Sequence, residues 1–198
     1  GNDRLFGGAG DDQLHSGTGI DLANGGSGID ELVGRVSGNA YLVNNTLYTI
    51  SPGVFSTGSL EGIETVSLYG NANDNMIMVQ GFKGNVNLHG NSGNDTLVSS
   101  SQDDYLYGGA GDDRIFGGLG NDQIVAGAGN DEIHGGGGHD LLLATVAGDV
   151  DLDDGEMHVI ESGQRETDTF DQIEGVMITA YSDVGIRMDA ADFSLGSV

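Results

Sequence analysis

The chain has 198 residues, a formal net charge of −25, 37 glycines, one proline and no cysteine. A mainly helical fold is excluded because an interior glycine costs a helix about 1 kcal/mol relative to alanine, and disulfides and thiolate zinc sites are excluded because there is no thiol. The charge argues against nucleic acid and anionic membranes as partners, and no apolar run approaches the roughly 18 residues that membrane insertion needs, so the composition favours cations as partners.

The chain opens with an array of a nine-residue phrase, Gly-Gly-x-Gly-x-Asp-x-apolar-x, over residues 1–33. The first copy starts in mid-phrase, and three copies follow in frame at 7–15, 16–24 and 25–33. The position-six aspartates of this array are Asp3, Asp12, Asp21 and Asp30. Its candidate turn glycines, at positions two and four, are Gly8, Gly10, Gly17 and Gly19. In each copy the glycines bend the backbone and the apolar residue contributes to the core.

An insert without the phrase follows at 34–89. Short runs rich in β-branched and aromatic residues at 39–43, 46–50 and 65–69 predict strands, because polar or glycine residues bound each run. We expect the insert to make broader turns that continue the same solenoid, with Phe55, Leu60 and Phe82 in a thicker core. A separate hairpin domain is the alternative.

The second array runs from 90 to 143 and contains the most regular copy, GGLGNDQIV, at 117–125. Its position-six aspartates are Asp95, Asp104, Asp113, Asp122, Asp131 and Asp140. Its candidate turn glycines are Gly109, Gly111, Gly118, Gly120, Gly127 and Gly129. In the copy at 99–107, Ser99, Ser100 and Gln102 replace all three glycines.

A second insert occupies 144–198, and it repeats the first. A shift of 110 residues superposes residues 25–68 on 135–178 without a gap, and the motif Ile-Glu-x-Val recurs at 63–66 and 173–176. We expect Phe170 and Phe193 to be core residues of this insert. The chain therefore reads as nearly two copies of one module, array then insert, and we expect it to be a fragment of a larger repetitive protein.

The phrase itself points to a hard cation. A carboxylate two residues before an apolar residue lies on the same face of a strand, at the mouth of the turn. Glycines at positions one, two and four allow positive φ and turn carbonyl oxygens toward that mouth. Calcium takes six to eight oxygen ligands in flexible geometry, whereas magnesium demands a smaller octahedron, so the pattern predicts calcium.

These residues resemble the RTX nonapeptide, the hemolysin-type calcium-binding repeat. The resemblance implies an all-β fold, a right-handed parallel β-roll or β-helix solenoid, in which two phrases make one coil and calcium lies in the turns between adjacent coils. It implies about six ions, each between position-six aspartates eighteen residues apart. The implied pairs are Asp3 with Asp21, Asp12 with Asp30, Asp95 with Asp113, Asp104 with Asp122, Asp113 with Asp131, and Asp122 with Asp140. The pair at Asp104 is the one we expect to be weakest, because its turn lacks the glycines.

The predicted function is calcium-gated folding rather than catalysis. Without calcium the aspartates repel one another, and six ions would offset about 12 of the 25 negative charges. The resemblance implies an extracellular protein that leaves bacteria by type I secretion and folds outside. We expect a structural or adhesive part of a large surface protein, stacked on neighbouring repeats and able to assemble with itself. The alternative is a secretion and folding appendage of a protease, lipase or epimerase.

Two other readings of the sequence carry less weight. The histidines His134 and His139 could suggest zinc, but they lack the spacing of a zinc motif, and we expect them to be solvent-facing turn residues. Nothing in the sequence assembles a nucleophile, a base and an orienting acid, so we expect no enzyme activity.

Overall fold

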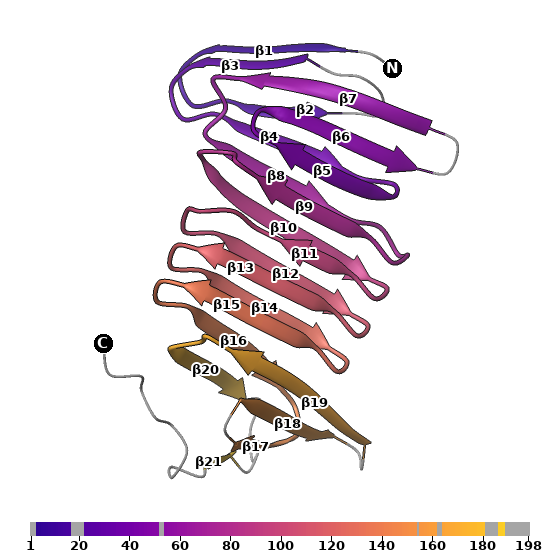
Figure 1. The fold of residues 1–198 in the computed structure, drawn as a ribbon, viewed down its shortest axis with the longest axis vertical. Helices are drawn as coiled ribbons and strands as arrows, with labels where there is room; N and C mark the ends of the chain where they lie inside the picture. Colours follow the sequence, from indigo (N-terminus) through magenta and orange to yellow (C-terminus); the bar gives the residue numbers. More distant parts are fainter. Residues whose placement is uncertain are drawn as a thin grey trace.

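The structure is a computed structural model that describes residues 3–16, 22–51, 54–153, 155–161, 164–180 and 186–188. Every regular element in these residues is a β-strand. The strands stack along the long axis, with β1 toward one end and β17 and β21 toward the other (Figure 1). Within the described ranges, no helix is long or apolar enough to span a membrane.

Each phrase of the two arrays forms one strand and one turn. The strands of the first array are β1 (Arg4–Ala9), β2 (Gln13–Ser16), β3 (Leu22–Ser27) and β4 (Glu31–Arg35). Those leading into and through the second array are β10 (Asn85–Ser92), β11 (Thr96–Val98), β12 (Tyr105–Ala110), β13 (Arg114–Leu119), β14 (Gln123–Ala128), β15 (Glu132–Gly137) and β16 (Leu141–Val146). Successive strands alternate between two sheets, and within each array a strand pairs in parallel with the strand eighteen residues on, as Ile115 does with Ile133. Two phrases therefore make one coil, which confirms the predicted parallel β solenoid.

The inserts join the same two sheets. Their strands are β5 (Asn39–Val43), β6 (Thr46–Ser51), β7 (Val54–Glu61), β8 (Thr65–Tyr69) and β9 (Met76–Gln80), then β17 (Asp149–Asp153), β18 (Glu156–Glu161), β19 (Gln164–Asp171), β20 (Gly175–Ala180) and β21 (Ile186–Met188). In the first insert β5, β6 and β7 form an antiparallel meander, and β7 pairs in parallel with β3 while β5 pairs in parallel with β9. The second insert repeats this arrangement with β17, β18 and β19.

The meander differs from the broader turns that the sequence analysis anticipated. The chain reverses direction twice inside the larger sheet, yet that sheet stays continuous, in the order β1-β3-β7-β6-β5-β9-β11-β13-β15-β19-β18-β17-β21. The smaller sheet runs β2-β4-β8-β10-β12-β14-β16-β20 without any reversal. The solenoid thus continues through the inserts, and the described residues form no separate hairpin domain.

The core is a column of position-eight side chains between the two sheets. Alternate residues of a strand face the same side, so Leu106, Ile115 and Ile124 point inward and are fully buried. One cluster of buried side chains runs from Leu14 to Leu142 through both arrays and the first insert. Burying one such side chain contributes roughly 1.5–3 kcal/mol.

The aromatic residues expected in the inserts are placed as follows. Phe82 is 1% exposed and Leu60 is 6% exposed in the main cluster. Phe170 is partly buried and packs against both this cluster and a smaller one in the second insert. The side chains of Phe55 and Phe193 lie outside the described residues.

Candidate metal centre

The position-six aspartates lie on the inner face of each turn, two residues before the core side chain. Carboxylates are rarely buried without a partner, yet Asp95, Asp113 and Asp122 are each only 1% exposed. Asp30, Asp104, Asp131 and Asp140 are likewise buried. Of the remaining predicted members, Asp3 is exposed and Asp12 is half-buried, while Asp21 lies outside the described residues.

One oxygen of each carboxylate joins successive coils. The Oδ1 atom of Asp113 accepts the amide N–H of Asp95 at 2.7 Å, and that of Asp131 accepts the amide N–H of Asp113 at 2.8 Å. The same bond joins Asp12 to Asp30, Asp104 to Asp122, and Asp122 to Asp140. The structure therefore brings together five of the six predicted pairs, each eighteen residues apart, through a side chain and a backbone amide.

The second oxygen of most of these carboxylates has no partner. The buried Oδ2 atoms that accept no hydrogen bond belong to Asp12, Asp30, Asp95, Asp113, Asp122, Asp131 and Asp140. Leaving a buried acceptor unsatisfied costs roughly 1–3 kcal/mol, and more for a charged group. Seven such atoms, three on one side of the solenoid and four on the other, are the feature that bound cations would satisfy.

Backbone oxygens converge on the same place. A Cβ atom added to Gly117 would lie 2.5 Å from Asp122 Oδ2 and 2.5 Å from the carbonyl oxygen of Gly135. A matching pair, one carboxylate oxygen and one carbonyl oxygen from the next coil, lies against Gly7, Gly25, Gly90, Gly108 and Gly135. Hard oxygen ligands of both kinds are those that calcium prefers. Within the described ranges no three His, Asp or Glu side chains gather as a metal cluster, so carbonyl ligands are essential to such a site.

Burial makes these carboxyl groups hard to ionise. Desolvation raises the pKa of Asp122 and Asp131 to about 7, and that of Asp95 and Asp113 to about 6, with neighbouring carboxylates adding to the effect. Burial also raises the pKa of Asp140. A cation at the orphaned oxygens would favour the charged form and reverse this shift.

The glycines have two different structural roles. At positions two and four the backbone takes positive φ, for example +105° at Gly118 and +119° at Gly120, as predicted. The same holds for Gly8, Gly10, Gly109, Gly111, Gly127 and Gly129, whereas Gly17 and Gly19 lie outside the described residues. Position one does not take positive φ, contrary to the expectation. At the glycines in this position the carboxylate and carbonyl oxygens lie too close to admit a Cβ atom without a shift, whereas Ser99 and Ala126 hold a side chain at the same position.

A second ladder, which the sequence analysis missed, runs along position five in the opposite direction. The amide N–H of Asp112 donates to Asn94 Oδ1 at 3.0 Å, and that of Asn130 donates to Asp112 Oδ1 at 2.9 Å. On the other side of the solenoid Asn121 donates to Asp103 in the same way. Asn and Asp alternate along the row of Asn94, Asp112 and Asn130, so like charges are not stacked directly on one another there. The available signal was the recurrence of Asn or Asp at this position.

The inserts supply carboxylates where the arrays end, and these too were missed. Glu64 Oε2 accepts the amide N–H of Asp30 at 3.0 Å, and Glu174 Oε2 accepts that of Asp140 at 2.6 Å. Asp168 Oδ1 accepts the amide N–H of Asp131 at 3.1 Å, and burial raises the pKa of Asp168 to about 7. The repeated Ile-Glu-x-Val motif held the signal for the two glutamates.

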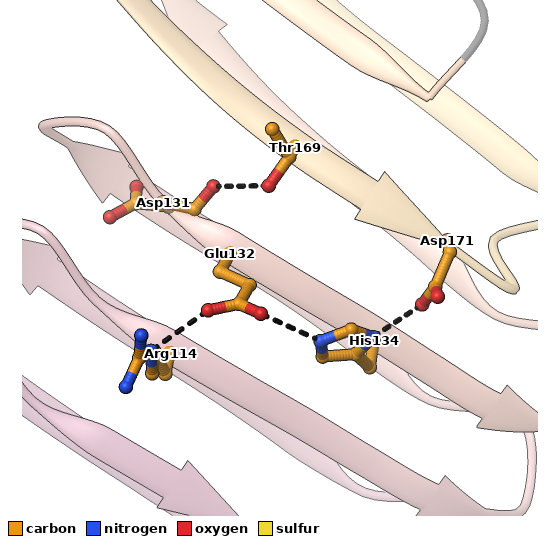
Figure 2. Close-up of polar contacts among 6 residues, drawn as sticks. All are labelled: Arg114, Asp131, Glu132, His134, Thr169 and Asp171. Carbon is orange, nitrogen blue, oxygen red and sulfur yellow. Dashed lines mark hydrogen bonds and ion pairs between the residues drawn. The ribbon is translucent and has the colours of Figure 1, made fainter.

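The outer surface beside Asp131 carries a chain of polar contacts (Figure 2). Glu132 pairs with Arg114 at 2.8 Å and with His134 at 3.3 Å, and His134 Nδ1 lies 2.5 Å from Asp171. Burial lowers the pKa of His134, but its hydrogen bonds to Asp171 and Glu132 outweigh burial and raise it. His134 is a strand residue stacked on Phe116, and not the turn residue that we expected.

Comparison with protein families finds a match to the RTX calcium-binding nonapeptide repeat. The match comprises four copies and includes residues 1–23, 89–124 and 116–145, which fall in the two arrays and overlap their edges. Comparison with curated proteins finds no match.

Proposed function

We propose that this chain, whose two arrays are RTX calcium-binding nonapeptide repeats, folds when calcium binds in its turns. The observation that supports the proposal is the set of seven buried aspartate Oδ2 atoms without a hydrogen-bond partner. Six of them, all but that of Asp131, lie against a position-one glycine together with a carbonyl oxygen of the next coil. Without a cation, these turns hold negative charge in a place where water cannot solvate it.

The number of Oδ2 atoms without a partner suggests how many calcium ions would bind. Four of them belong to the first aspartate of a predicted pair, namely Asp12, Asp95, Asp113 and Asp122. Three more, on Asp30, Asp131 and Asp140, adjoin the insert carboxylates. One ion per orphaned oxygen gives about seven ions in the described residues, and their charge would offset about 14 of the 25 negative charges.

The proposed setting is extracellular. Extracellular calcium modules typically bind at about 10⁻⁴ to 10⁻³ M, which is well above cytosolic calcium levels. A chain secreted unfolded would therefore fold only after export, consistent with type I secretion.

The proposed role is structural, as a stiffened segment of a surface or adhesive protein. The strands of the first module recur in the second at a shift of 110 residues, as β5 (Asn39–Val43) does in β17 (Asp149–Asp153). Such repetition suits an extended element in which each coil buries its apolar face against the next.

A circular dichroism titration tests calcium-gated folding. We expect weak β signal in excess chelator and a cooperative gain at millimolar calcium, with magnesium much less effective because it prefers a smaller octahedral site. Identical spectra with chelator and with calcium would refute the proposal.

A further inference from the structure

The turn at residues 99–104 is built differently from its neighbours. The Ser99 hydroxyl donates a short hydrogen bond to Asp104 Oδ2, the oxygen that the other turns leave without a partner. The amide N–H of Ser100 lies 3.5 Å from the same oxygen. Asp104 Oδ1 accepts the amide N–H of Val86 at 2.8 Å. Both oxygens of this buried carboxylate are therefore satisfied by the protein itself.

We propose that Ser99 takes the place of the cation in this turn, so that the predicted calcium site between Asp104 and Asp122 does not form. The inference rests on the proposed function of the other turns. A serine hydroxyl offers one proton to a carboxylate oxygen, and Ser99 stands at position one, where most copies of the phrase have glycine. Hydrogen bonds of Ser99 and Val86 satisfy the carboxylate on this side of the coil, whereas the proposed cation would satisfy Asp95 on the other side.

The backbone supports this assignment independently. Positions two and four of the glycine-containing turns have positive φ, and even Asn91, at position two of the preceding copy, takes φ of 77°. Ser100 and Gln102 stand at the same positions but do not have positive φ. This turn therefore lacks the left-handed residues found at positions two and four of the other turns. Its carboxylate, unlike theirs, also has no oxygen without a hydrogen bond.

Two matched variants test the inference through the calcium content of the protein. Asp104→Asn and Asp113→Asn remove the same charge at the same position of the phrase. Each protein is equilibrated in saturating calcium and gel-filtered, and calcium per chain is measured by atomic emission. We expect Asp113→Asn to hold at least one ion fewer than wild type and Asp104→Asn to hold the same number. Equal losses from both variants would overturn the Ser99 assignment, whereas a wild-type protein without calcium would overturn the proposed function.

A gain-of-site variant keeps the test decisive if a carboxylate substitution impairs folding. The triple variant Ser99→Gly, Ser100→Gly, Gln102→Gly restores the regular phrase, and we expect it to hold one more calcium than wild type. Ser101→Gly is the control, because Ser101 is in the same turn and makes no bond to Asp104. An unchanged count in the triple variant, or an equal gain in the control, would contradict the inference.

Discussion

Acid should partly replace calcium in folding the arrays. Burial raises the pKa of Asp122, Asp131 and Asp168 to about 7 in the folded state, above the value of about 3.9 for aspartate in an unfolded chain. The folded state then binds more protons than the unfolded state. Its stabilisation is complete below the unfolded pKa and is lost as pH rises through the folded pKa. Calcium-free protein should therefore be more stable at pH 5 than at pH 8.

The size of the effect follows from the pKa shifts. Between pH 8 and pH 5, a group with a folded pKa of about 7 contributes about 3 kcal/mol, and one with a pKa of about 6 contributes about 1 kcal/mol. Asp95 and Asp113 belong to the second class. Relaxation and water penetration around buried charges reduce these figures. Even a third of their combined contribution is about 4 kcal/mol, which is comparable to the total stability of a small domain.

The assay is far-ultraviolet circular dichroism of calcium-stripped protein titrated from pH 8 to pH 5. Sedimentation is recorded at each pH, because the isoelectric point of about 4.1 brings a risk of association at lower pH. Asp131→Asn removes one titrating group and should flatten the pH dependence. Asp11→Asn makes the same change at an exposed position of the first array, away from the titrating groups, and should leave the pH dependence as in wild type. The reasoning fails if β signal is the same at both pH values, or if both variants respond alike.

Three further predictions concern the core, the turns and the array ends. Ile124→Ala, at a fully buried position, should lower the free energy of unfolding in saturating calcium by about 2–5 kcal/mol in urea titrations. The control is Leu119→Ala, where the side chain is 61% exposed, and it should change this free energy by less than about 0.5 kcal/mol. Gly127→Ala should lower the melting temperature of the protein more than Gly8→Ala. Both glycines have similar positive φ, but only at Gly127 would a Cβ overlap a carbonyl oxygen, that of Gly109. Equal melting temperatures would contradict this. Glu174→Ala should lower the free energy of unfolding by about 1–3 kcal/mol and remove one bound calcium, because it leaves the Asp140 amide without an acceptor. Glu174→Gln keeps an acceptor oxygen and should retain most of the stability, which calorimetry measures.

The sequence was sufficient for the fold class because the information is local and repeated. A nine-residue period with an apolar residue at position eight places Leu106, Ile115 and Ile124 in one column, whatever the rest of the chain does. The assignment of the two arrays to the RTX calcium-binding nonapeptide repeat follows from the same phrase and is confirmed. The aspartate pairs could be named for the same reason, since a fixed period fixes which residues stack, although their calcium occupancy stays a prediction.

Tertiary structure decided the features that depend on contacts between distant strands. The sequence could not show that β7, and not β5, pairs with β3. A short run of β-forming residues predicts a strand but not its direction or the strand it pairs with. That choice, and its equivalent at β19, determines that Asp168 reaches Asp131, thirty-seven residues earlier.

The sequence by itself therefore determined the coil, its core column and the row of carboxylates, because these arise from residues within one period of each other. Only the tertiary structure decided how each carboxylate is satisfied. It left one oxygen open in seven turns and closed it with Ser99 in another, because that difference depends on side-chain and backbone geometry that the repeated phrase does not encode.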